Sequence, residues 1–120
     1  LYTAMSRSTK KEYVNFCFRT YSTKKGFVYK ITNEDTDKIY IGSTTTSLEQ
    51  RFKEHKESND GSPLHSDMKI YNKWKIELVK EINFVDLQQL LISETCYIIS
   101  HNSIENGYNT KLSLKIDNIY

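Results

Sequence analysis

Cysteine is scarce in this chain of 120 residues, and no arrangement of cysteine and histidine suggests a metal site. The two cysteines, Cys17 and Cys96, stand far apart, and neither has the paired Cys or His spacing of a zinc ligand set. Each lies within a segment of apolar periodicity, which is typical of a buried residue. We therefore expect two reduced thiols in the core.

Long apolar runs are also missing. No stretch approaches the roughly 20 residues of a membrane-spanning helix, and the first residues lack the charged-then-apolar order of a secretory signal. Repeats and low-complexity tracts are absent too. A chain of this length forms one domain, which we expect to be soluble and intracellular, in the cytoplasm or nucleus.

The chain also lacks a large excess of one charge, since it has 17 basic and 15 acidic residues. A net charge of +2 permits nucleic-acid binding without arguing for it. The lysines recur in pairs and short groups with tyrosines between them, a mixture that can hold phosphates. Ordinary solvated faces remain the alternative reading of the same pattern.

The periodicity of the chain predicts an α+β domain in which a small, three-stranded antiparallel sheet is flanked by helices. Strands are expected at 26–31, 38–42 and 75–82, and helices from Ser47, at 66–74 and at 86–101. A capping box at Thr9 predicts a further helix, although 13–18 also fits a strand. In the third strand Val79 breaks an alternation that places three residues on one side: Ile76, Leu78 and Ile82.

Charged residues lie on the apolar stripes of two predicted helices. Arg51 and His55 share the stripe of the first helix with Leu48 and Phe52. Glu94 lies in the middle of the stripe of the last helix: Leu87, Leu90, Leu91, Glu94, Tyr97, Ile98 and His101. An ionised carboxylate in an apolar interface is costly unless it is paired or bound. Either Arg51 and Glu94 form a buried ion pair, or they line a cleft where charge is used.

The predicted hairpin places Tyr29 and Tyr40 on adjacent strands, and the whole arrangement resembles the GIY-YIG nuclease family. The match is closest to the catalytic domains of phage-type homing endonucleases and spans about 26–109. The segments that carry it are Phe27-Val28-Tyr29 for the first triplet with its glycine replaced, Tyr40-Ile41-Gly42 for the second, then Arg51, His55, His65, Glu94 and Asn106-Gly107-Tyr108-Asn109.

The resemblance implies an endonuclease that hydrolyses DNA phosphodiester bonds with one Mg²⁺ (or Mn²⁺) ion. It implies catalytic roles for Tyr29, Tyr40, Arg51, His55 and Glu94, with Glu94 as the metal ligand. It implies substrate contacts for Gly42, Lys53, His65 and Asn109. Tyr29 is the base by resemblance, and Tyr40 is the alternative because the hairpin brings both hydroxyls toward one place. His55 would relay a proton or form a hydrogen bond to a tyrosine.

We expect an N-terminal extension at 1–25 that is partly helical, a nuclease domain at 26–110 and a C-terminal tail at 111–120. The expected partner is DNA, held through its phosphate backbone, with no membrane contact. A sequence-recognition segment is either absent or supplied elsewhere. Two alternatives remain open: a catalytically inactive nucleic-acid-binding or interaction module of the same fold, and a nuclease that acts on RNA or branched DNA.

Overall fold

A computed structural model of the chain describes residues 23–113. Three strands form one antiparallel sheet in the order β2-β1-β3, with β1 in the centre. The elements follow in the order β1 (Lys24–Asn33), β2 (Tyr40–Thr44), α2 (Leu48–Glu57), α3 (Pro63–Met68), β3 (Trp74–Phe84) and α4 (Leu87–Ser100). The predicted three-stranded α+β domain is confirmed. The helix predicted after Thr9, and Cys17, lie outside the described residues.

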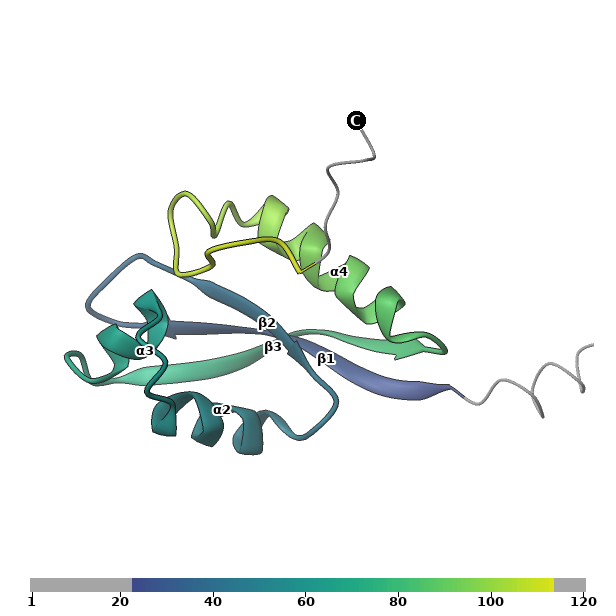
Figure 1. Ribbon diagram of the computed structural model, residues 1–120, viewed down its shortest axis with the longest axis horizontal. Coiled ribbons are helices and arrows are strands. Elements are labelled where there is room, and N and C mark those ends of the chain that lie inside the picture. Colours follow the sequence, from purple (N-terminus) through teal and green to yellow (C-terminus); the bar gives the residue numbers. More distant parts are fainter. Residues whose placement is uncertain (1–22, 114–120) are drawn as a thin grey trace, which may run out of the picture.

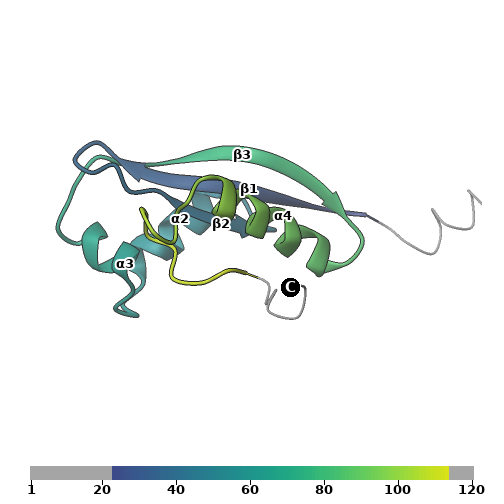
Figure 2. The same ribbon diagram turned by 90° about the horizontal axis from the view of Figure 1, so that it is seen from above.

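Helices cover both faces of the sheet, α4 on one face and α2 with α3 on the other (Figures 1 and 2). Successive side chains of a strand point to opposite faces, so β1 contributes to two cores. The core under α4 consists of Val28, Ile41, Phe84, Leu90 and Ile98. The core under α2 and α3 consists of Tyr29, Ile31, Leu64 and Tyr108. No helix in 23–113 is long and apolar enough to cross a membrane.

A β-bulge at Val79 reverses the faces of β3. The register between β1 and β3 steps by one residue between Val28 and Tyr29, which leaves Val79 without a partner. An extra residue moves the following side chains to the other face. Ile76 therefore packs toward α2, whereas Ile82 packs toward α4. The prediction that Ile76, Leu78 and Ile82 share one side of this strand is therefore wrong.

Side-chain caps set the starts of the helices. The hydroxyl of Ser47 accepts from the backbone N–H of Gln50 at the start of α2. Asp86 and Gln89 form the predicted capping box at the start of α4, and the helix ends with His101 as its C-cap. All three boundaries agree with the sequence prediction.

The short helix α3 lies earlier in the chain than the predicted 66–74. Pro63 occupies its first turn, where the missing N–H costs nothing, and Ser62 caps it by accepting from the N–H of His65. Lys73 has a positive φ of 64°, which excludes a helix that runs on to Trp74. Trp74 instead begins β3.

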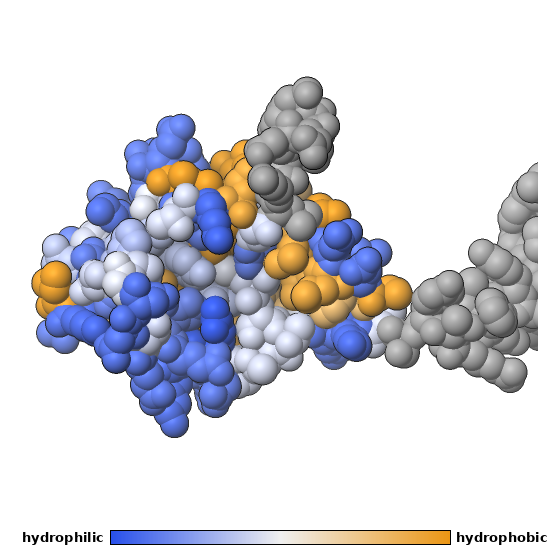
Figure 3. Space-filling model, in the orientation of Figure 1, coloured by the Kyte–Doolittle hydropathy of each residue, from blue (hydrophilic) through white to orange (hydrophobic). Residues whose placement is uncertain are grey.

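The outer face of α4 is apolar and exposed. Figure 3 shows apolar side chains gathering over this part of the molecule, whereas hydrophilic ones cover α2 and α3. The exposed apolar residues of α4 are Leu87, Ile92 and Ile99. Cys96 is exposed on the same helix, so the prediction of a core thiol is wrong for it. The predicted stripe is buried at Leu90 and Ile98, while its ends, Leu87 and His101, are exposed.

We predict that Gly107→Ala destabilises the domain. A Cβ at Gly107 would lie 2.6 Å from the carbonyl oxygen of Ser103 and still closer to that of Ile39, and backbone atoms cannot move aside as a flexible side chain can. The free energy of unfolding, measured by urea denaturation, should fall by about 1–3 kcal/mol. Asn106→Ala, an exposed neighbour, should change it by less than about 0.5 kcal/mol. Equal stabilities would contradict the tight approach.

Candidate active site

The hydroxyl of Tyr29 is the most enclosed polar group of the site. Tyr29 lies on the central strand and is fully buried. A Cβ on Gly42, its partner in β2, would lie 2.5 Å from this hydroxyl, so only glycine leaves room for it. Arg51 donates from Nε to the hydroxyl oxygen at 3.2 Å, and Nε2 of His55 lies 2.7 Å from it.

His55 connects this hydroxyl to a second histidine. It follows Arg51 by four residues on α2, which places both side chains on the same face of the helix. His55 Nδ1 lies 2.8 Å from Nε2 of His65, and Nδ1 of His65 lies 2.6 Å from a carboxylate oxygen of Asp60. Burial, followed by the charges of Arg51 and His65, lowers the pKa of His55 to about 4. His55 is therefore neutral at neutral pH.

Arg51 and Glu94 do not pair with each other. Arg51 donates from Nη1 to Glu54 at 3.2 Å, and Glu94 accepts from the hydroxyl of Ser43 at 2.6 Å. Burial raises the pKa of Glu94, and the bond from Ser43 opposes this rise. The ion-pair hypothesis is not supported by these partners, because each charged group has another one.

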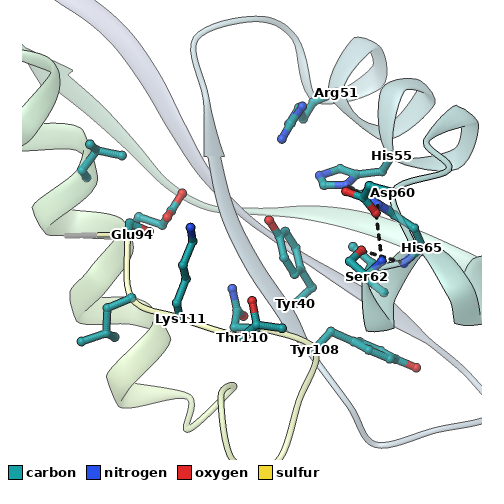
Figure 4. Close-up of a pocket in the computed structure, with 15 residues that line it drawn as sticks. Tyr40, Arg51, His55, Asp60, Ser62, His65, Glu94, Tyr108, Thr110 and Lys111 are labelled. Carbon is teal, nitrogen blue, oxygen red and sulfur yellow. Dashed lines mark hydrogen bonds and ion pairs between the residues drawn. The ribbon is translucent and has the colours of Figure 1, made fainter. Parts of the chain in front are cut away.

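Both groups instead line a cavity of about 880 Å³ (Figure 4). Glu94 enters it from α4, Arg51 and His55 enter it from α2, and Tyr40 projects between them from β2. The geometry therefore fits the second reading of the charged stripes, a cleft where charge is used.

The two tyrosines of the hairpin differ in access. Tyr40 lines the cavity and is half-buried, whereas Tyr29 lies beneath it. Their ring centroids are 6.3 Å apart. Burial raises the pKa of Tyr29 well above its ordinary range, Tyr40 raises it further, and Arg51 opposes the rise. Burial and then Glu94 raise the pKa of Tyr40. Both phenols are protonated at neutral pH in the free protein.

The segment after α4 closes the cavity and is fastened to β2. The Asn109 side chain accepts from the N–H of Ile41 and donates to its carbonyl, each at 2.8 Å. Tyr108 donates its backbone N–H to Ile39 and its hydroxyl to Asp67. The Asn109 amide is thus held by the backbone of β2, and its contact with substrate stays a prediction.

The remaining predicted residues fall in different places. His65 lines the cavity, and Gly42 is buried against Tyr29. Lys53 is exposed and does not line the cavity, so any DNA contact it makes lies outside. Two charged lining residues were missed, Asp60 and Lys111. The amine of Lys111 points between Glu94 and Tyr40 in Figure 4. Both residues are in loops, where no periodicity marks the direction of a side chain.

Comparison with known protein families identifies the family to which this arrangement belongs. The GIY-YIG catalytic domain matches residues 25–109. The chain belongs to the GIY-YIG family. It carries a GIY-YIG nuclease domain, as the resemblance of its sequence predicted.

Two solved structures share the GIY-YIG fold with this chain. A mutant of the catalytic domain of the intron endonuclease I-TevI is 26% identical, with a TM-score of 0.63, over 73% of this chain and 95% of that domain. The catalytic domain of the homing endonuclease I-TevI is 25% identical, with a TM-score of 0.61, over 72% and 98%. The homing-endonuclease type of the domain is therefore confirmed.

Two proteins of Invertebrate iridescent virus 6 are also similar to this GIY-YIG chain. The putative MSV199 domain-containing protein 146R is 30% identical over 99 residues, which are 78% of this chain and 40% of that protein. The uncharacterized protein 019R is 36% identical over 93 residues, 72% of this chain and 33% of that protein. The chain thus spans well under half the length of these relatives.

The low pKa of His55 predicts a loss of stability in acid. The unfolded chain takes up a proton near the ordinary value of 6.5, whereas the folded chain does so only near 4. As the pH falls from about 6.5 to 4 the unfolded state binds more protons, so the free energy of unfolding decreases and then levels off. The free energy of unfolding, measured by urea denaturation across this pH range, should depend less steeply on pH in His55→Gln, because glutamine cannot titrate. Equal slopes for both proteins would contradict the low value.

Proposed function

We propose that this chain is a divalent-metal-dependent endonuclease that hydrolyses DNA phosphodiester bonds. The observation that carries the proposal is that Arg51 and Glu94 face one cavity from opposite sides instead of neutralising each other, with a tyrosine between them. Hydrolysis of a phosphodiester needs charge stabilisation on phosphoryl oxygens, an activated water and help for the departing 3′ oxygen. The membership of the GIY-YIG family supports this chemistry.

Arg51 is suited to hold the scissile phosphate. Its guanidinium presents a planar fork that matches phosphate oxygens, and the side chain is 36% exposed. Its contact with Glu54 is a partly exposed ion pair between residues three apart on one helix. Such pairs contribute little, so a phosphate can replace Glu54 at small cost. A phosphate would take the place of Glu54 at Nη1, while Nε keeps its bond to the hydroxyl of Tyr29.

Glu94 fits a single-metal site. Two carboxylates line the cavity, and Asp60 is bonded to His65, which leaves Glu94 to face the open space. No cluster of three or more metal-ligating side chains occurs in residues 23–113. One carboxylate suits Mg²⁺, which keeps much of its shell of water and substrate oxygens. When bound, the ion would neutralise charge on the phosphoryl group and on the departing oxygen.

Tyr29 is the proposed general base, because its hydroxyl has a proton acceptor already in place. A phenol can take a proton from water only after it has lost its own, and Nε2 of the neutral His55 lies 2.7 Å away. Arg51 bonds to the same oxygen and would stabilise its negative form. The hydroxyl of Tyr40 has no hydrogen-bond partner among the residues described, and we assign it to orienting water or phosphate in the cavity.

The partner and the extent of the nuclease unit are part of the proposal. DNA would be held through its phosphates, with Lys111 and Arg51 supplying positive charge at the cavity. The family match supports a nuclease unit at 26–110, between an N-terminal extension at 1–25 and a tail at 111–120. Selection of a DNA sequence would depend on residues outside this unit.

The first test replaces the metal ligand. Glu94→Gln keeps the size of the side chain and an acceptor for Ser43 but removes the charge, so cleavage of supercoiled plasmid in Mg²⁺ should be lost while DNA binding in a mobility-shift assay persists. Glu57→Gln, an exposed carboxylate of α2 outside the cavity, should cleave as the wild type does. Cleavage by Glu94→Gln at the wild-type rate would refute the metal assignment. A wild type that binds DNA but never cuts it would point to an inactive module.

The second test compares the two tyrosines. Phenylalanine keeps each ring and removes only the hydroxyl. Tyr29→Phe should lower single-turnover cleavage by a factor on the order of a hundred or more, the usual contribution of a positioned base. Tyr40→Phe should lose less. The wild-type rate should rise with pH until the base ionises, and this limb should disappear in Tyr29→Phe. If Tyr40→Phe loses more activity and the pH limb, the two roles must be exchanged.

A further inference from the structure

Four side chains form one continuous hydrogen-bonded series from beneath the cavity to the surface. Tyr29 and His55 are 2.7 Å apart, His55 and His65 are 2.8 Å apart, and His65 and Asp60 are 2.6 Å apart. They come from β1, α2, α3 and the loop between the two helices. The two imidazole rings, whose centroids are 5.1 Å apart, and the carboxylate beside them can be followed in Figure 4. The family match names none of these contacts.

The carboxylate at the outer end determines the direction of every bond. Hydrogen bonds, first of all the one from His65, lower the pKa of Asp60 to about 2, so Asp60 is ionised and can only accept. His65 must then donate from Nδ1, which leaves its Nε2 free to accept from Nδ1 of His55 when His65 is neutral. Nε2 of His55 in turn accepts from the hydroxyl of Tyr29.

The opposite tautomer of His55 would not serve Tyr29. A proton on Nε2 would be directed at the phenol oxygen, which already accepts from Nε of Arg51. The hydroxyl proton would then have no acceptor at His55. The orientation of the series therefore decides whether Tyr29 can lose its proton.

Burial explains why the series has to continue beyond His55. His55 is 3% exposed, and both burial and the charge of Arg51 oppose a positive charge there. The side chain of His65 is 11% exposed and that of Asp60 is 57% exposed. A positive charge that moves on to His65 is neutralised by an adjacent carboxylate, which is itself in contact with solvent.

We propose that Asp60 is a positioning residue for the nuclease reaction, which through His65 holds His55 in the tautomer whose Nε2 receives the Tyr29 proton. This inference rests on the proposed function. Asp60 is also a turn residue, because its carboxylate accepts from the N–H of Ser62. A purely structural role in that turn is the competing explanation.

The proton balance of the step is closed. The O–H bond of Tyr29 breaks as an N–H bond forms at Nε2 of His55, while the proton on Nδ1 of His55 passes to Nε2 of His65. The phenolate takes a proton from water, whose oxygen attacks phosphorus with its electron pair, and the bond from phosphorus to the 3′ oxygen breaks. The departing oxygen takes a proton from solvent. The series is restored when Tyr29 gives its proton to solvent and takes back the proton on Nε2 of His55, while His65 returns a proton to Nδ1 of His55.

Two substitutions separate the effect of the His55 tautomer from the effect of the negative charge of Asp60. Asp60→Ala removes the acceptor, so His65 and His55 should populate the other tautomer. Asp60→Asn removes the charge but keeps a carbonyl oxygen, which the N–H of Ser62 holds in place, so the tautomers should persist. The imidazole ¹⁵N chemical shifts of the full chain report the tautomers directly. Ser62→Ala is the control for a loosened turn, because it removes the cap of α3 and a side-chain contact of Asp60 but none of the four side chains of the series.

Single-turnover cleavage should fall by a factor on the order of a hundred in Asp60→Ala and by less in Asp60→Asn, with unchanged DNA affinity. The shifts of His55 in Ser62→Ala should match the wild type. Unchanged tautomers in Asp60→Ala, or an Asp60→Asn protein with native tautomers that is as slow as Asp60→Ala, would overturn the inference. Should the wild type cut no DNA, the proposed function fails, and the tautomers alone still decide whether Asp60 orients His55.

Discussion

The site depends on the space that Gly42 leaves for one phenol oxygen. Tyr29 points from the central strand into the layer beneath α2, and only the missing side chain at Gly42 lets its hydroxyl reach that far. Once the oxygen is there, it needs partners, because a buried hydroxyl without them costs free energy. Arg51 and His55, one helical turn apart, supply both partners. The position of α2 on the sheet is thus tied to a polar contact as well as to apolar packing.

The burial of the sheet on both faces keeps Glu94 apart from Tyr29 and its histidines. Residues of β1 alternate between the core under α4 and the core under α2, so Tyr29 and its histidines lie on one side while Glu94 approaches from the other. Tyr40, at the edge strand, stands where the two sides meet at the cavity (Figure 4). The carboxylate of Glu94 and the guanidinium of Arg51 can therefore share one cavity without forming the ion pair that would cancel their charges.

Sequence periodicity predicted the parts of the site that stand on regular elements. Arg51, His55 and Glu94 could be found because charge on an apolar helical stripe is unusual, and helix spacing fixes direction. Asp60 and Lys111 could not, because loop geometry comes from tertiary contacts. The bulge at Val79 was visible only as a broken alternation, since nothing in one strand tells which partner residue it skips.

The ends of α4 and the cysteine show a different limit. Leu87 and Cys96 are apolar in type, and periodicity placed them in the core, yet both are exposed on a helix with more apolar residues than one sheet face can cover. The register of a stripe is predictable, whereas its width depends on how much surface the partner offers.

The fastening of Asn109 has a consequence for association between molecules. β2 is an edge strand, and the unpaired N–H and C=O groups of such a strand are a template on which another chain can add. The Asn109 amide occupies both groups of Ile41, and the N–H of Tyr108 occupies the carbonyl of Ile39, much as a neighbouring strand would. The segment that closes the cavity therefore also shields this edge against intermolecular β-sheet growth. Loss of that segment would expose a strand edge that can pair with another molecule, and it would also open the cavity.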